Sequence, residues 1–186
     1  MTKKTDKIKS YRVLLNKGLN FLEKAPVWPL LEEEIALVRK CGATLFLAGN
    51  GGSASNANHL ATDLIYGANM QGKGAFRVHA LSANSSVMTC LGNDAGYENI
   101  FAKQLEALAR AGDRVIVFSG SGNSPNILRA LQAARRLRVR SIAFLGFDGG
   151  KAKALSDLVL HFPIHDMQVT EDLHMIAGHL LLKASQ

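Results

Sequence analysis

The chain has 186 residues, of which 47% are hydrophobic and 20% charged, so it can bury one sizeable core. Its two cysteines, Cys41 and Cys90, are too few and too far apart for a disulfide framework or a cysteine-based zinc site. No apolar run approaches the roughly 20 residues that a membrane span requires, and the basic start leads into an amphipathic pattern rather than an apolar signal core. We therefore expect a cytoplasmic protein with no membrane partner.

Much of the net charge of +7 comes from five arginines on one predicted helix and its exit: Arg129, Arg135, Arg136, Arg138 and Arg140. Such a cluster can attract nucleic acid or acidic small molecules. Because no aromatic residues interleave with these arginines to stack on bases, we interpret them as a solvated helix face and expect no nucleic-acid partner.

Two helices are predicted before the first strand, over residues 4–25 and 29–41, from apolar residues at helical spacing. Neither helix can belong to a strand–helix–strand crossover, so both must pack on the flank of the sheet or on another subunit. We favour the second alternative and expect residues 1–42 to form a helical pair for oligomerisation.

From residue 44 onward, strand and helix patterns alternate. Strands are predicted over 44–48, 76–81, 114–118, 141–145 and 158–163, and helices over 53–66, 85–91, 97–111, 124–138, 151–155 and 170–183. Five short apolar strands separated by helices predict an α/β fold over residues 43–186, with a doubly wound parallel sheet covered on both faces. In such sheets ligands bind beyond the carboxyl ends of the strands.

Two segments that follow predicted strands are rich in glycine and hydroxyl side chains. They are Gly49-Asn50-Gly51-Gly52-Ser53-Ala54-Ser55 and Ser119-Gly120-Ser121-Gly122-Asn123-Ser124-Pro125. Each stands directly before a predicted helix, where free backbone N–H groups and the positive end of the helix dipole attract an anion. One such turn is usually structural, but two at strand ends of one small domain favour a bound phosphate.

The first segment also fits the permissive form of the dinucleotide-binding fingerprint G-x-G-x-x-G/A. That fingerprint requires an acidic residue about 20 positions later to hold the ribose hydroxyls. The sequence has no Asp or Glu between Asp63 and Asp94. Binding of NAD is therefore disfavoured. Binding of NADP, for which Arg77 is the candidate contact, is disfavoured only slightly less.

Ionisable residues on two predicted helices form a candidate proton-transfer or metal site. His59 and Asp63 are four residues apart and share one face of the helix that leaves the first loop. On the otherwise apolar C-terminal helix, Glu171 and His179 lie about 80° apart around the axis. Because buried ionisable groups are costly unless paired or ligated, two helices that each offer a carboxylate and a histidine favour a functional site.

Together these motifs resemble the sugar isomerase (SIS) domain family, and within it the phosphoheptose isomerases, over essentially the whole chain. The most specific segments are Gly49 to Ser53, Gly92-Asn93-Asp94, Ser119 to Ser124, Asp148-Gly149-Gly150 and a closing Glu-x-x-His-x-x-x-x-His over 171–179. The resemblance implies an aldose–ketose isomerase that converts sedoheptulose 7-phosphate to D-glycero-D-manno-heptose 7-phosphate, in the synthesis of precursors for cell-surface polysaccharides. We also expect a homotetramer.

The resemblance further implies roles for individual residues. Asp63 matches the catalytic base and His179 the catalytic acid. Zinc is the expected cofactor, held by His59, Asp63, Glu171 and His179. The phosphate is expected at Ser119, Ser121 and Ser124, rather than in the first loop. Substrate contacts as a whole are expected at Asn50, Gly51, Gly52, Ser53, Ser55, Asn93, Asp94, Ser119, Gly120, Ser121, Asn123, Ser124 and Glu171.

Several residues depart from the family pattern. Asp63 stands where a longer glutamate is usual, and Glu171 where a glutamine is usual, so two carboxylates and two histidines would face one cation and form a stronger metal site. Gly120 replaces the usual threonine. Residues 67–71 lack an arginine that the heptose isomerases usually carry.

A different class of function is the main alternative. The family contains a non-catalytic branch that binds the bacterial replication initiator protein, and members of that branch lose the carboxylate and the histidine. A module that binds a sugar phosphate or this protein therefore competes with the enzyme. Retention of Asp63 and His179 favours the enzyme.

Overall fold

The computed structural model describes residues 2–67 and 76–184. Its centre is a sheet of five parallel strands in the spatial order β2-β1-β3-β4-β5. The strands are β1 (Thr44–Gly49), β2 (Arg77–Ala80), β3 (Arg114–Ser119), β4 (Arg140–Leu145) and β5 (Leu158–His161). This arrangement confirms the predicted α/β class, and each predicted strand end is right to within two residues.

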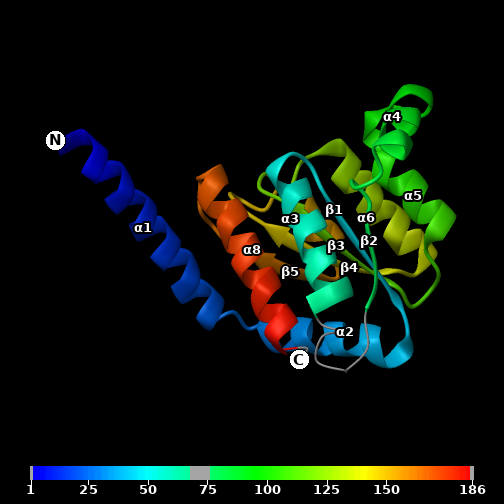
Figure 1. Cartoon of the computed structure of the whole chain (residues 1–186), viewed down its shortest axis with the longest axis horizontal. Helices are drawn as coiled ribbons and strands as arrows, with labels where there is room; N and C mark the ends of the chain where they lie inside the picture. The colour runs from blue at the N-terminus through cyan, green and yellow to red at the C-terminus, as the bar shows by residue number, and fades with distance from the viewer. Residues whose placement is uncertain (1, 68–75, 185–186) are drawn as a thin grey trace.

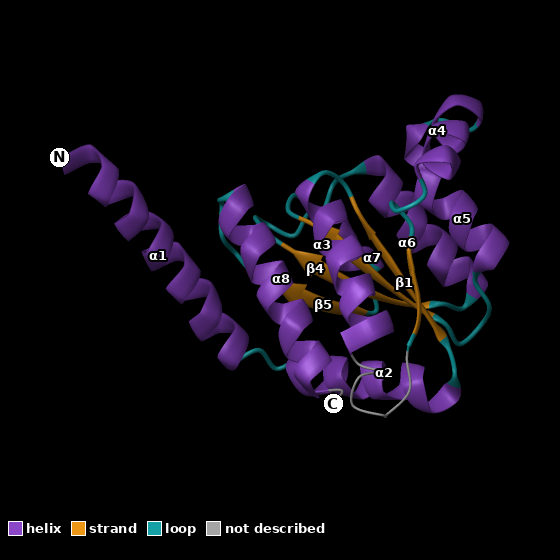
Figure 2. Cartoon of the chain, viewed as in Figure 1, coloured by secondary structure: helices purple, strands orange, loops and turns teal. Residues whose placement is uncertain are grey.

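Helices cover both faces of the sheet (Figures 1 and 2). One face carries α1 (Thr2–Glu23), α2 (Trp28–Cys41), α3 (Gly52–Thr62) and α8 (Met167–Ala184); the other carries α4 (Ser85–Asp94), α5 (Ile100–Leu108), α6 (Pro125–Leu137) and α7 (Ala152–Leu155). Side chains alternate along β1, so Leu45 and Leu47 join the first core while Phe46 and Ala48 join the second. Among the described residues, no helix is long and apolar enough to cross a bilayer.

The direction in which the chain winds reverses at β1. β2 lies on one side of β1, and the chain then crosses to β3 on the other side. Gly49 at the end of β1 is in register with Phe118 of β3. The loops that leave these two strands are therefore neighbours at the carboxyl edge of the sheet, where open α/β sheets bind ligands.

Two predicted helices are divided in the structure. The helix expected over 53–66 is α-helical to Thr62 and continues as a π-helix, η1 (Asp63–Gly67). The helix expected over 97–111 begins with a 3-10 helix, η3 (Tyr97–Asn99), before α5. Apolar spacing over so few residues does not distinguish these hydrogen-bond patterns. Residues 68–71, part of the segment without the usual arginine, lie outside the described residues.

Helix α1 extends from the body of the molecule beside α8 (Figure 1). Leu173 of α8 packs directly against Gly18, and the Tyr11 hydroxyl donates to Asp172. Ile8 and Val13 remain exposed over 69% and 64% of their surface. The oligomerising role of residues 1–42 stays a prediction.

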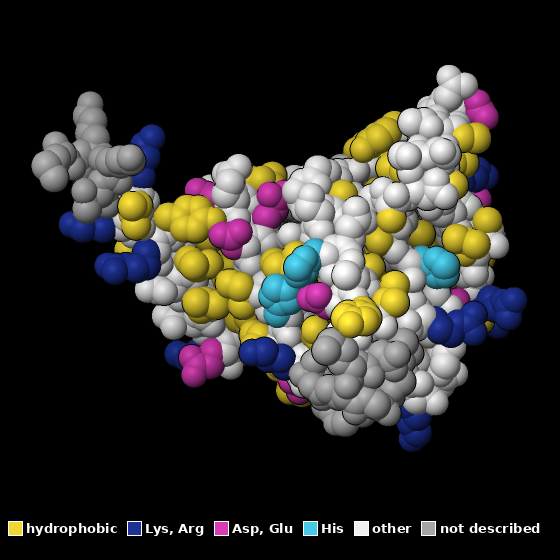
Figure 3. Space-filling model, viewed as in Figure 1, with side chains coloured by type: hydrophobic (Ala, Val, Ile, Leu, Met, Phe, Trp, Pro, Cys, Tyr) yellow, Lys and Arg dark blue, Asp and Glu magenta, His cyan; other side chains and the backbone are white. Residues whose placement is uncertain are grey.

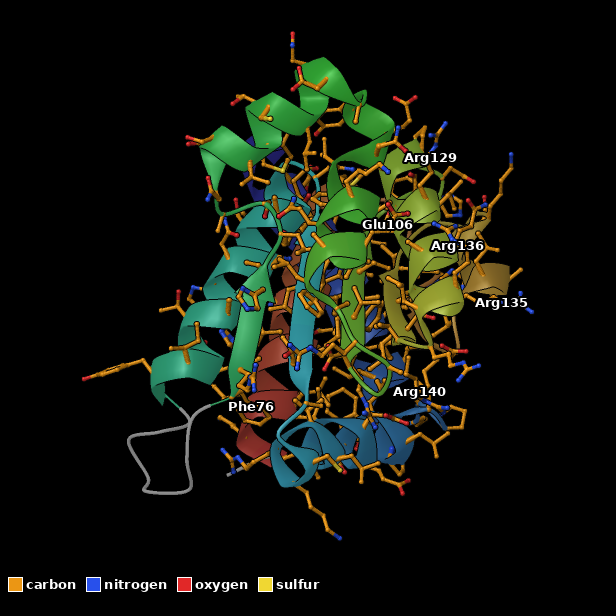
Figure 4. All side chains as sticks on the ribbon, turned by 90° about the vertical axis from the view of Figure 1, so that its right-hand side faces the viewer. Phe76, Glu106, Arg129, Arg135, Arg136 and Arg140 are labelled. Carbon is orange, nitrogen blue, oxygen red and sulfur yellow. The ribbon has the colours of Figure 1, made fainter. Side chains whose placement is uncertain are left out.

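The arginine-rich helix α6 and its exit form a solvated face (Figure 4). All five arginines of the predicted cluster are exposed. Arg129 lies 3.5 Å from Glu98 and Arg136 lies 2.8 Å from Glu106. Arg140 lies 2.6 Å from Glu34 of α2. The five arginines therefore lie on an exposed face, and the expected absence of a nucleic-acid partner stays a prediction.

Candidate active site

The loops after β1 and β3 enclose a pocket of about 260 Å³. Polar residues of both loops line it, and α8 contributes Met167 and Glu171. The lining residues are Asn50, Gly51, Gly52, Ser53, Phe118, Ser119, Gly120, Ser121, Ser124, Met167 and Glu171. The structure therefore brings most of the predicted substrate contacts into one place.

Hydrogen bonds within the second loop hold its hydroxyls in place. Ser119 Oγ accepts from the backbone N–H of Gly122 at 3.1 Å, and Ser121 Oγ accepts from the N–H of Asn123 at 3.2 Å. Ser124 occupies the N-cap of α6, but its side chain makes no capping bond. Its hydroxyl, at the positive end of α6, is therefore free to donate to an anion.

The Asp148-Gly149-Gly150 motif supports this loop from behind. Gly122 has φ of 64° and lies so close to the Gly149 carbonyl that a side chain there would overlap it. The N–H of Ala152 donates to the Gly122 carbonyl at 2.9 Å. Asn123, a predicted substrate contact, accepts from the N–H of Lys151 at 3.0 Å and braces the same junction.

Three of the four predicted metal ligands lie together between α3 and α8. The Nε2 atoms of His59 and His179 are 3.1 Å apart, and Asp63 Oδ2 lies 3.4 Å from each of them. Asp63 is the first residue of the π-helix η1, a type of turn often found at functional sites. Histidine and acidic side chains gather at the surface over α3 and α8 (Figure 3), so the cluster is open to solvent.

The His59–Asp63–His179 cluster fits a divalent metal ion. Its ligand atoms all lie within 4.8 Å of one another. Two bare ring nitrogens at 3.1 Å repel, so either a proton or a cation must lie between the imidazoles. Two imidazoles and a carboxylate are a donor set that zinc accepts.

Glu171, the fourth predicted ligand, lies apart from this cluster. It precedes His179 by about 12 Å along the axis of α8, and it is not in the group whose ligand atoms converge. Its carboxylate packs against Gly52. Burial raises the pKa of Glu171, and a hydrogen bond from the Ser53 backbone opposes that rise. In this structure Glu171 therefore faces the serine-lined pocket, as its predicted role in substrate binding requires.

Comparisons with known proteins agree with this geometry. The model of the SIS domain family matches residues 31–146. The chain belongs to the SIS domain family. The phosphoheptose isomerase of Trichlorobacter lovleyi is 42% identical over 157 residues, which cover 84% of this chain and 79% of that protein. The phosphoheptose isomerase of Pelobacter propionicus is 38% identical over 177 residues, which cover 95% and 92%.

Solved structures extend the similarity beyond residues 31–146 to nearly the whole chain. Phosphoheptose isomerase GmhA from Neisseria gonorrhoeae superimposes with a TM-score of 0.88 at 29% identity and covers 98% of both chains. A phosphoheptose isomerase from Francisella tularensis gives a TM-score of 0.87 at 29% identity, covering 100% of this chain and 98% of that one. The predicted membership of the phosphoheptose isomerase group is confirmed.

Other predicted contacts of this SIS domain lie away from the pocket. Asn93 and Asp94 end α4, where the Asn93 amide donates to Asp94 at 2.7 Å. Neither residue lines the pocket between the two loops. Ser55 is exposed, and its hydroxyl lies 3.5 Å from the Gly51 carbonyl.

The sequence analysis missed two residues of the SIS domain that contact the first loop. Asn126, only 1% exposed, pairs its amide with that of Asn50, and the Tyr97 hydroxyl reaches the same Asn50 side chain at 3.2 Å. Asn126 had a detectable signal, because it is a polar residue four positions before Ala130 on the apolar face of α6. Tyr97 had no detectable signal in the sequence beyond its position after Gly92-Asn93-Asp94.

Proposed function

We propose that this chain isomerises sedoheptulose 7-phosphate to D-glycero-D-manno-heptose 7-phosphate, in the synthesis of heptose precursors for cell-surface polysaccharides. One observation carries the proposal. Helices α3 and α8 run from the serine-lined pocket, whose hydroxyl and backbone N–H groups can bind an anion, to a cluster of two histidines and a carboxylate. Along α3 the rise from Ser53 to His59 is about 9 Å. This separation suits a substrate whose phosphate and reacting carbons lie at opposite ends of a long chain.

The residues support proton transfer between adjacent carbons. Asp63 takes a proton from C1 of the ketose, beside the carbonyl, and an enediolate forms. His179 moves the proton of the C1 hydroxyl to the oxygen on C2, and Asp63 returns its proton to C2. Atoms and charge balance without an external oxidant or reductant. The serine loop holds the phosphate and so keeps C1 and C2 at the cluster.

We further propose that His59, Asp63 and His179 hold zinc. When bound there, zinc would polarise the carbonyl and hydroxyl oxygens of the substrate. Supporting observations are the convergence of the three side chains and their donor chemistry. Asp63 and His179 would then be both ligands and proton-transfer groups, so a chelator experiment is needed to separate the two roles.

The test is an assay of the purified protein against a panel of ketose phosphates, with and without chelator and added zinc. We expect aldose product from sedoheptulose 7-phosphate. Asp63→Asn and His179→Gln should abolish turnover while phosphate-ligand binding, measured by calorimetry, stays within about twofold. Binding of the sugar phosphate without turnover by the unmodified chain would instead favour the non-catalytic alternative. Unchanged isomerisation in both variants would refute the site assignment.

A further inference from the structure

The amide of Asn50, a predicted substrate contact, is held by a reciprocal pair of hydrogen bonds. Asn50 Nδ2 donates to Asn126 Oδ1 at 2.9 Å, and Asn126 Nδ2 donates to Asn50 Oδ1 at 2.8 Å. Asn50 lies in the first loop, and Asn126 lies in the first turn of α6 behind the second loop. The pair therefore ties together the two loops that form the pocket.

A backbone group fixes the orientation of both amides. The N–H of Ile127 donates to Asn126 Oδ1 at 2.9 Å, and a backbone N–H can only donate. The oxygen of Asn126 must therefore face Ile127, which leaves Asn50 Nδ2 as the donor to that oxygen. It follows that Asn50 Oδ1 must face the Asn126 amino group, so neither amide is free to flip.

A second donor occupies the remaining acceptor position of the Asn50 side-chain oxygen. The Tyr97 hydroxyl lies 3.2 Å from Asn50 Oδ1. Tyr97 itself is placed by α6, because Arg129 donates to Asn99 at 2.7 Å and lies 3.5 Å from Glu98 in the same short segment. Arg129 extends from α6 toward this segment (Figure 4). Asn50 Oδ1 thus has two donors, and one amide N–H of Asn50 remains for a ligand.

We propose that Asn126 is a positioning residue that fixes Asn50 as a donor to the substrate. In this arrangement the Asn50 side chain offers an N–H to a hydroxyl or carbonyl oxygen of the sugar, outside the phosphate group, and offers no acceptor. Asn126 acts only through Asn50, with the Tyr97 hydroxyl as a weaker second support. The inference deepens the proposed function and rests on it for the identity of the substrate.

The test combines kinetics with a double-mutant cycle. Asn126→Ala should raise KM for sedoheptulose 7-phosphate roughly three- to tenfold, the effect of one lost hydrogen bond, and change kcat less. Tyr97→Phe, at an exposed position that does not threaten folding, should raise KM about twofold. In an Asn50→Ala background, Asn126→Ala should add less than twofold, because the residue it positions is already absent.

A second readout needs neither substrate nor turnover. In ¹⁵N-labelled protein, the side-chain amide resonances of Asn50, assigned by their loss in Asn50→Ala, should shift in Asn126→Ala and to a smaller extent in Tyr97→Phe. Unmoved resonances would overturn the proposal even if the chain had no isomerase activity. An inactive chain with shifted resonances would count against the proposed function and leave the positioning role supported.

Two controls separate positioning from a general structural effect. Ser141→Ala removes hydrogen bonds to Asp157 at the amino end of β4, opposite the loops, so it should lower stability without changing KM. The inhibition constant of inorganic phosphate should stay within twofold in Asn126→Ala. A parallel loss of phosphate affinity, or multiplicative effects in the Asn50→Ala background, would show that Asn126 supports α6 rather than Asn50.

Discussion

Glu171 places a carboxylate beside a pocket whose other groups favour an anion. It lies against Gly52 and accepts from the Ser53 N–H, at the N-terminus of α3. Burial raises its pKa, because a low-dielectric environment disfavours the charged form. The resemblance to heptose isomerases implies a neutral glutamine at this position, so the ionised carboxylate of this chain would oppose the proposed phosphate binding.

We therefore predict that Glu171→Gln tightens anion binding. Removing repulsion of about 0.5–1 kcal/mol should lower the inhibition constant of sulfate roughly two- to fivefold at pH 8. Because its pKa is raised, Glu171 takes up a proton more readily as the pH is lowered, so the advantage of the variant should shrink as the pH is lowered from 8. Sulfate keeps its charge over this range and serves as the probe in a competition assay. Weaker binding in the variant would show that the carboxylate itself contacts the ligand.

His174 is a buried imidazole in an apolar environment. It is fully buried and packs against Phe118, Phe144 and Phe162, with ring centroids about 6 Å away. Neither ring nitrogen has a partner of hydrogen-bond geometry among the described residues. Burial lowers the pKa of His174 to about 4, a fall that the nearby Leu145 backbone opposes. The folded protein therefore holds this histidine neutral.

The pH dependence of stability should reveal this group. As the pH falls below about 6.5, His174 binds a proton in the unfolded chain but stays neutral in the folded chain, so the free energy of unfolding falls. The loss continues down to about pH 4 and amounts to about 3 kcal/mol from this residue. His174→Phe should remove that part of the slope. The measurement is urea unfolding from pH 7 to 4, and equal slopes in the two proteins would contradict the prediction.

At the scale of elements, the His59–Asp63–His179 cluster depends on how closely α3 approaches α8. Gly178 leaves so little room that a Cβ atom there would lie 3.3 Å from Leu60. The Asn56 amide donates to the Glu171 carbonyl at 2.8 Å and fixes the two helices lengthwise. The close approach that brings His59 near His179 is therefore supported by Gly178 and one cross-helix hydrogen bond.

Gly178→Leu should separate the two helices and with them the two histidines. A displacement of about 1 Å in a reacting group lowers kcat/KM by about 100-fold, while overpacking lowers stability by only about 1–3 kcal/mol. Gly178→Ala serves as the control, because a single methyl group should lower activity less than tenfold. Activity and thermal unfolding are measured together. A folded Gly178→Leu protein with full kcat/KM would show that the α3–α8 distance does not limit the reaction.

The sequence predicted the elements better than it predicted how they meet. Apolar runs gave the strands because β1, β3 and β4 are buried on both faces. The sequence analysis missed the π-helix that begins at Asp63, because that helix depends on local hydrogen bonds. It also missed Met167, which fills the space beside Gly120: a Cβ atom on that glycine would lie 2.5 Å from the sulfur. Contacts between elements distant in sequence leave no periodic signal.

The two helices of the proposed metal site, α3 and α8, show the same limit. Angular spacing predicted that Glu171 and His179 share a face of α8. It did not consider the distance between Glu171 and His179 along the helix axis. Because of this distance, Glu171 lies at the serine-lined pocket and only three of the predicted ligands lie at the cluster. The sequence therefore identified residues that the structure brings near one another, while the division of the site into two parts required coordinates.

At the scale of the whole molecule, two apolar surfaces remain exposed. Ile8 and Val13 lie on α1, which extends from the body (Figure 1). A cleft of about 1060 Å³ runs beside the edge strand β2, and its lining includes the exposed Ile65 and Leu108. Exposed apolar surface can mark a subunit contact. It supports the proposed homotetramer, in which further copies of this chain would cover both surfaces.

We predict that a charge on α1 disrupts this assembly. The unmodified protein should sediment with the mass of four 20.0-kDa chains, and Val13→Asp should yield smaller species, because an unpaired carboxylate in a subunit contact costs several kcal/mol. Asn16→Asp adds the same charge at an exposed polar position of the same helix and should leave the mass unchanged. Circular dichroism checks that both variants keep their helical content. A monomeric unmodified protein, or a Val13→Asp protein that still sediments as four chains, would place the exposed residues of α1 outside any subunit contact.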